Sequence, residues 1–106
     1  MKGEIQNAAP EASILTAREI EYLSLVAMGF KNIEIADILS VTNSTVKKTL
    51  ENIFSKLNAK NRTYAVTTAF VHRVITSQKL SEIFLRYKNS IEKISLVAVN
   101  SWFDEK

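Results

Sequence analysis

The sequence of 106 residues contains no cysteine, which excludes disulfide bonds and metal sites built on thiolates. Glycine and proline are also scarce, with two and one residues, and runs in which apolar and polar residues alternate are hard to find. Glycine and proline punctuate turns and loops, and strict alternation is the pattern of a half-buried strand. These absences together predict an all-α chain.

Long hydrophobic runs are absent as well. No apolar segment approaches the roughly 20 residues that a membrane-spanning helix needs, and the first residues lack the charged-then-apolar order of a secretory signal. The apolar content of 46% and the charged content of 24% are ordinary for a globular protein. We therefore expect a cytoplasmic protein with no membrane partner.

The sequence offers little to an active site. Histidine occurs once, as His72, so no second histidine and no cysteine is available for a transition-metal site. A glycine-rich phosphate loop, a G-x-S-x-G nucleophile motif and an H-E-x-x-H zinc motif are all missing. We therefore expect neither enzymatic activity nor a cofactor, and we interpret His72 as an ordinary helix residue.

Positive charge is unevenly distributed, although the net charge is only +3. Residues 1–42 hold three basic and six acidic side chains, giving −3. Residues 43–62 hold five basic and one acidic, giving +4, and residues 63–106 hold six and four, giving +2. A concentrated basic block indicates a polyanionic partner, although a block of this size can also complement acidic neighbours within a fold.

The basic block coincides with residues 42–62, TNSTVKKTLENIFSKLNAKNR. On a helix with about 100° per residue, its apolar and polar side chains fall on opposite sides. The apolar side consists of Val46, Leu50, Ile53, Phe54 and Leu57, and the polar side of Ser44, Lys47, Lys48, Glu51 and Ser55. Such a helix can pack on a core and lie in a DNA major groove, although an ordinary amphipathic surface helix has the same pattern.

Two shorter helices are predicted before this stretch. Thr16 and Glu19 have the spacing of a capping box, and Gly29 suits a left-handed stop, which places the first helix at about 16–28. Asn32 is the predicted cap of a second, shorter helix. A short helix, a turn of three or four residues and a longer helix with a basic outer face form a helix-turn-helix.

Residues 14–75 resemble the DNA-binding domain of the LuxR/GerE family of bacterial transcription regulators. Six blocks stand at the family spacing: L-T-x-R-E from Leu15, A-x-G from Ala27, E-I-A from Glu34, T-V-K from Thr45, I-F-x-K-L from Ile53, and Arg62. The resemblance implies four helices, with the third as recognition helix and the fourth, from Asn61, used for dimerisation. The buried or shared faces of that fourth helix would carry Ala65, Val66, Ala69, Phe70 and Val74.

The resemblance also assigns a DNA interface of seven residues. The positions that match Lys47, Lys48 and Glu51 approach base edges in the major groove. Those that lie close to phosphates match Thr42, Ser44, Thr45 and Lys56. Glu51 departs from the family pattern, in which a basic or neutral residue is common; a glutamate can accept a hydrogen bond from cytosine N4, but it repels phosphate.

Two further segments flank residues 14–75. Residues 1–13 have no helical or strand period and are expected to form a flexible arm without a role in DNA binding. Residues 76–106 are expected to form a C-terminal helical extension, broken into two helices at Asn89–Ser90. The extension either stabilises a dimer, which we slightly favour, or folds back on its own domain. A heptad-like stripe in the extension runs for only about two heptads, fewer than the three or four typical of a coiled coil, and consists of Phe84, Tyr87, Ile91, Ile94 and Ala98.

The sequence thus predicts an all-α, four-helix LuxR/GerE-type domain with a helical extension, acting as a homodimeric regulator that binds specific double-stranded DNA at the nucleoid. The alternative is a protein-interaction module that pairs with another helix-turn-helix regulator without binding DNA tightly. A sigma-factor-like promoter reader that contacts RNA polymerase is a third possibility. Because about 14 residues precede the resemblance, we expect no receiver or ligand-sensing domain, and control through abundance, a partner or dimer assembly.

Overall fold

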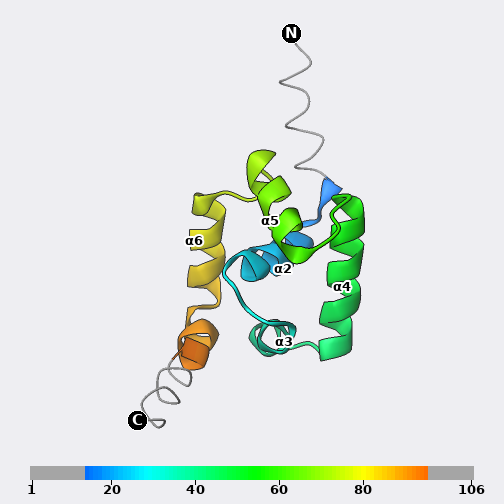
Figure 1. Ribbon diagram of the computed structural model, residues 1–106. Coiled ribbons are helices and arrows are strands. Elements are labelled where there is room, and N and C mark those ends of the chain that lie inside the picture. The colour runs from blue at the N-terminus through cyan, green and yellow to red at the C-terminus, as the bar shows by residue number, and fades with distance from the viewer. Residues whose placement is uncertain (1–13, 96–106) are drawn as a thin grey trace, which may run out of the picture.

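The computed structural model describes residues 14–95, and within that range the chain is helical with no strand. Five helices follow one another: α2 (Ala17–Ala27), α3 (Asn32–Leu39), α4 (Asn43–Lys56), α5 (Arg62–Val71) and α6 (Ser77–Arg86). Residues 88–95 are also helical. The prediction of an all-α domain with a helical extension is confirmed (Figure 1).

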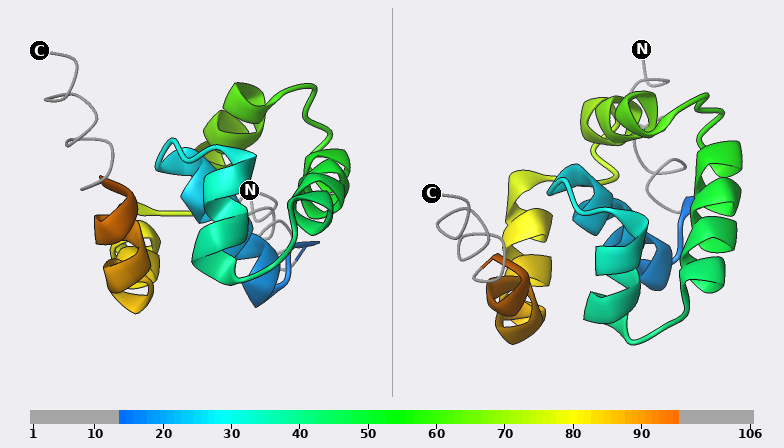
Figure 2. Two further views of the ribbon diagram at one scale, coloured as in Figure 1. Left: turned by 90° about the horizontal axis from the view of Figure 1, so that it is seen from below. Right: turned by 60° about the horizontal axis from the view of Figure 1, so that its bottom comes forward.

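Helix α2 lies at the centre of the domain and contacts each of the other four named helices. Figures 1 and 2 show it between α4 on one side and α6 on the other. Leu23 and Leu25 are completely buried on it. The predicted capping box is present, because Thr16 Oγ1 accepts from the backbone N–H of Glu19 at 3.1 Å and Glu19 Oε1 accepts from that of Thr16 at 2.9 Å. Gly29, with φ of +94°, follows the end of the helix as predicted.

The start of α3 differs from the prediction that Asn32 caps it. Lys31 is the extended cap residue, and its backbone N–H donates to the carboxylate of Glu34 at 2.8 Å. Asn32 is the first helical residue, and its side-chain oxygen accepts from Arg62 at 2.7 Å. The asparagine does not cap the helix because its side chain is used in a contact with a residue 30 positions away.

Helix α4 packs on the core through the side that the sequence predicts to be apolar. Val46, Leu50 and Ile53 are buried, while Phe54 and Leu57 are partly buried against the same core. The helix is shorter than residues 42–62, because Leu57 is its C-terminal cap and Asn58 has a left-handed φ of 55°. The backbone N–H of Ala59 then donates to the carbonyl of Phe54 at 2.8 Å and closes the end.

Helix α5 begins after Asn61, whose side chain accepts from the N–H of Tyr64 at 2.8 Å, in agreement with the expected fourth helix. Ala65 and Ala69 are completely buried, Val66 is partly buried, and Phe70 is 39% exposed. The helix ends at Val71, so the buried Val74 lies in the connection to α6 and not on α5.

The extension packs on its own domain as far as residue 95. Ile83 of α6 and Ile91 are buried in the same core as α2. The helix breaks at Tyr87, and Asn89–Ser90, the predicted break, lies within the helical residues 88–95. Tyr87 is the C-terminal cap of α6, and its hydroxyl donates to the carboxylate of Glu21 at 2.9 Å. Residues 1–13 and 96–106, which include Ala98 of the predicted stripe, lie outside the described residues.

Candidate nucleic-acid interface

The outer face of α4, with the residues at its two ends, carries all seven predicted DNA-contacting residues. Each of them is exposed: Thr42, Ser44, Thr45, Lys47, Lys48, Glu51 and Lys56. The buried side of the same helix fixes its rotation, because rolling the helix would bring Val46 and Ile53, both completely buried, into water. The core thus determines which side chains α4 presents outward.

The start of α4 is shaped by a tight turn. Ser40 adopts a left-handed conformation with φ 59° and ψ 48°, and Val41 N–H donates to the carbonyl of Ala36 at 2.9 Å. Thr42 then caps α4: its Oγ1 accepts from the N–H of Thr45 at 3.1 Å and donates to Thr45 Oγ1 at 2.9 Å. A capped helix N-terminus with exposed hydroxyls and a positive dipole end suits a phosphate group.

The three lysines of α4 differ in their partners. Among residues 14–95, no carboxylate lies within ion-pair distance of Lys47 or Lys48. Lys56, in contrast, donates from its Nζ to both carboxylate oxygens of Glu19, each at 2.9 Å. Two lysines therefore present their charge to solvent, while the third is paired with the first turn of α2.

Arg62 belongs to the basic block in sequence, but it serves as a cross-link within the fold. Its Nη1 donates to Asn32 Oδ1 at 2.7 Å and its Nη2 to the carbonyl of Phe30 at 2.8 Å. These two bonds tie the start of α5 to the turn between α2 and α3. Arg62 therefore supports the position of the helix-turn-helix and does not extend its outer face.

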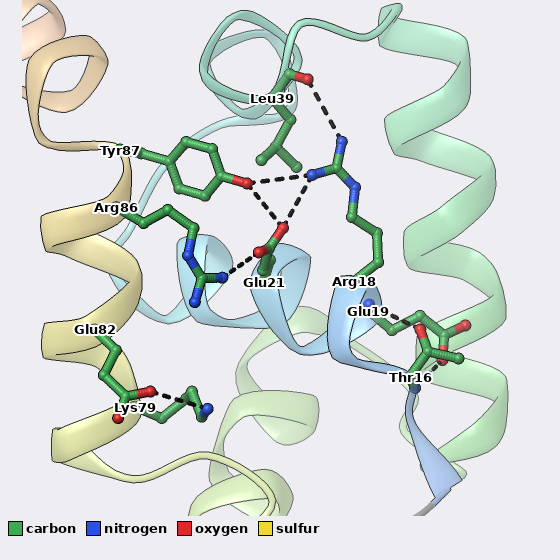
Figure 3. A network of polar contacts seen from close by, with 9 residues as sticks. All are labelled: Thr16, Arg18, Glu19, Glu21, Leu39, Lys79, Glu82, Arg86 and Tyr87. Carbon is green, nitrogen blue, oxygen red and sulfur yellow. Dashed lines mark hydrogen bonds and ion pairs between the residues drawn. The ribbon is translucent and has the colours of Figure 1, made fainter.

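A polar cluster joins α2 to the junction after α6 (Figure 3). The side chain of Glu21 is only 12% exposed. Its carboxylate accepts hydrogen bonds from Arg18 Nη1 and from the hydroxyl of Tyr87, both at 2.9 Å. It also forms an ion pair with Arg86. Arg18 also donates to the carbonyl of Leu39, at the end of α3, at 3.5 Å. The cluster thus attaches the extension to α2 close to the turn before α4.

The environments of Glu19 and Glu21 favour their charged forms. Burial would raise the pKa of Glu21, but the hydrogen bonds from Tyr87, Arg18 and Arg86 outweigh it and leave the pKa below 4.5. Burial acts in the same direction on Glu19, where the bonds from Lys56 and Thr16 likewise lower the pKa. Burial and the hydrogen bond to Glu21 raise the pKa of Tyr87. Both carboxylates are therefore ionised at neutral pH.

Residues 14–95 contain no helix with the length and apolar character that a membrane span requires. No three side chains of the types that bind metals come together in this part of the chain.

Comparison with known proteins agrees with this geometry. The family model described as bacterial regulatory proteins of the luxR family matches residues 13–69. The chain belongs to the LuxR family. Among curated proteins, the response regulator protein VraR of Staphylococcus aureus, Staphylococcus saprophyticus and Staphylococcus epidermidis is 43% identical over 75 residues, which cover 71% of this chain.

The aligned part spans about a third of those relatives, 36% of their length. No significant match to a solved structure was found. The family establishes that this LuxR-family chain carries the DNA-binding domain of a transcription regulator.

Two features of this LuxR-family domain were not found from the sequence. The capping-box spacing identified Glu19, but no local signal indicated that Lys56, 37 residues away, bonds to the same carboxylate. The sequence does not single out Glu21, because an isolated glutamate in a helix is normally exposed. A shielded carboxylate needs cationic or hydroxyl donors. The adjacent Arg86 and Tyr87, which can supply both, are the one sequence signal for its partners.

Proposed function

We propose that this chain reads a specific double-stranded DNA sequence by placing α4 in the major groove. The observation that carries the proposal is the outer face of α4, where Lys47 and Lys48 are exposed and have no carboxylate partner among residues 14–95. A lysine that reaches the groove can donate to guanine O6 and N7. Glu51, on the same face, accepts from cytosine N4.

Residues at the start of α4 would fix the helix on the sugar-phosphate backbone. The hydroxyl of Thr42 donates a hydrogen bond to the hydroxyl of Thr45 at 2.9 Å. Ser44, between them in sequence, is exposed. Hydroxyl groups and backbone N–H groups at a helix N-terminus are common phosphate ligands. Contacts of this kind set the register of the protein on the duplex, whereas Lys47, Lys48 and Glu51 would carry the sequence preference.

Dimerisation is proposed to occur through α5. Its outer surface leaves large apolar groups in solvent, because Tyr64 is 48% and Val71 69% exposed, beside Phe70 at 39%. Two copies related by a two-fold axis would present their α4 helices about 34 Å apart, one turn of DNA, on a partly palindromic site. The regulator would act at the nucleoid in the cytoplasm. The extension packs on α2, so only the side of it that remains exposed to solvent could contribute to the dimer.

A second candidate function is a module that pairs with another helix-turn-helix regulator. An apolar groove on the far side from α4 favours it, lined by Met28, Leu80, Ser81, Phe84 and Leu85. Glu51 lies on α4, the helix that would enter the DNA major groove, and its negative charge weakens the attraction to phosphate. In this case the folded protein would show no salt-dependent affinity for duplex DNA and would co-purify with a partner of the same fold.

Fluorescence anisotropy of labelled duplex DNA tests the proposal. The Lys47→Ala/Lys48→Ala variant is compared with Lys88→Ala/Lys93→Ala, which removes the same charge from exposed residues of the extension. We expect the first to lose about tenfold or more in affinity, since a good base contact contributes about 1–3 kcal/mol, and the second to change little. Equal affinities of the two variants, with unchanged helicity by circular dichroism, would contradict the assignment of α4.

A further inference from the structure

We propose that Glu19 is a positioning residue that withdraws Lys56 from the DNA-contacting cations, so that the phosphate contacts of α4 are unequal at its two edges. This inference rests on the proposed function and deepens it. It concerns the pair formed by the Lys56 ammonium and the Glu19 carboxylate, and it changes the number of phosphates that the domain neutralises.

The position of Lys56 on α4 makes its charge relevant to DNA. At about 100° per residue, Lys56 lies about 180° around the helix from Lys47 and about 80° from Lys48. Lys47 and Lys56 therefore stand at opposite edges of the polar face, with Lys48 between them. The helix of 14 residues is about 21 Å long, whereas the major groove is about 12 Å wide. A helix longer than the groove is wide can extend past the groove, which would bring the end that carries Lys56 to the sugar-phosphate backbone.

The contacts of Lys56 show that it is held by the protein. Its Nζ is 2.9 Å from both Oε1 and Oε2 of Glu19, which joins the last residue of α4 to the first turn of α2. The Glu19 side chain is 15% exposed, against 39% for Lys56. The carboxylate is thus shielded from water more than its partner, and a partly desolvated carboxylate keeps a cationic partner more firmly than a surface one does.

The carboxylate itself cannot follow the lysine toward DNA. Glu19 Oε1 also accepts from the backbone N–H of Thr16 at 2.9 Å, while Thr16 Oγ1 accepts from the N–H of Glu19. This capping box fixes the glutamate at the start of α2, which is visible in Figure 3. A phosphate that took Lys56 would leave the Glu19 carboxylate, whose side chain is 15% exposed, without its cation and close to a polyanion. The pair is therefore retained when DNA binds.

The salt dependence of DNA binding counts the neutralised phosphates and is the property to measure. Each phosphate contributes about −0.9 to the slope of log affinity against log salt concentration. In the wild-type protein, Lys56→Met should leave this slope unchanged. Glu19→Gln keeps the capping bond to Thr16, because glutamine is accepted at that position of the box, but it removes the charge that holds Lys56.

We expect Glu19→Gln to steepen the slope by about 0.9 and to raise the affinity at low salt. The double variant Glu19→Gln/Lys56→Met should return the slope to the wild-type value. Glu82→Gln is the matched control: it removes the same charge from an ion pair with Lys79 on α6, on the other side of the domain, and should leave the slope unchanged.

Two results would overturn the inference. One is a slope that falls by about 0.9 in Lys56→Met alone, which would mean that Lys56 contacts a phosphate in the wild-type protein. The other is a slope that stays constant in Glu19→Gln, which would mean that Lys56 lies out of reach of phosphates. Thermal unfolding confirms that each variant is folded. Failure of the proposed function is distinguishable, since Lys47→Ala/Lys48→Ala would then leave DNA binding unchanged as well.

Discussion

Replacement of Ile83 by alanine tests whether α6 is docked on α2 in solution. Ile83 is 1% exposed and is the one buried residue of α6. It belongs to the same core as Leu23 and Leu25 of α2. If the extension were a free arm in the monomer, the side chain of Ile83 would already be in water and its truncation would cost little.

The size of the effect follows from the burial. The substitution removes three carbon atoms from the core, which at about 0.8 kcal/mol per buried methylene gives about 2.4 kcal/mol. A residual cavity adds to this, so that such truncations cost about 2–5 kcal/mol. The better helix propensity of alanine offsets at most about 0.7 kcal/mol. For a domain of this size, a loss of 2 kcal/mol lowers Tm by at least about 8 °C.

Urea unfolding followed by circular dichroism at 222 nm gives the free energy of unfolding. The control is Leu85→Ala, two residues further along the same helix, where the side chain is 66% exposed. Its effect should remain within about 0.5 kcal/mol. A loss below about 0.5 kcal/mol for Ile83→Ala, equal to that of the control, would refute the docking of α6 on the domain.

Two further predictions concern buried polar contacts. Arg62→Ala should lower the free energy of unfolding by about 1–3 kcal/mol, because the carbonyl of Phe30 and the side chain of Asn32 lose their donor; Lys60→Ala, an exposed neighbour, should change it little in the same urea titration. The pKa of Glu21 is lower in the folded state than its ordinary 4.5, so its contribution to stability is present above about pH 4.5 and is lost as the pH falls through the folded pKa. Urea titrations between pH 7 and pH 3 should therefore show stability falling with acid, and a steep acid loss of equal size in Glu21→Gln would contradict this role.

Local signals in the sequence were sufficient for most of the fold. The capping box of Thr16 and Glu19 and the stop at Gly29 depend on residues within a few positions of each other, and both are present. Asn32 was assigned wrongly because a cap and a long-range partner require the same side-chain oxygen, and the sequence does not reveal that Arg62 lies nearby.

The position of the extension depends on a contact between residues far apart in the sequence, which no local spacing of residues can predict. A stripe that includes Tyr87, Ile91 and Ile94 can face a second chain or the same domain equally well, because both remove apolar surface from water. What favours the domain is Glu21, a carboxylate on α2 with a side chain 12% exposed, which finds Arg86 and Tyr87 at the junction after α6. A shielded carboxylate requires such donors, and so it selects the docked arrangement up to residue 95.

The candidate interface likewise shows that the sequence predicts its overall charge but not the contacts of each basic side chain. A basic block indicates the class of ligand, since its excess charge is visible from a distance of several ångströms whatever each side chain contacts. The individual roles depend on short-range bonds: Lys56 is paired with Glu19, Arg62 is bonded to neutral groups, and Lys47 and Lys48 have no carboxylate partner among residues 14–95. The sequence thus indicates a polyanionic partner, whereas under the proposed function the number of phosphates that α4 neutralises would depend on which lysines the fold has already paired.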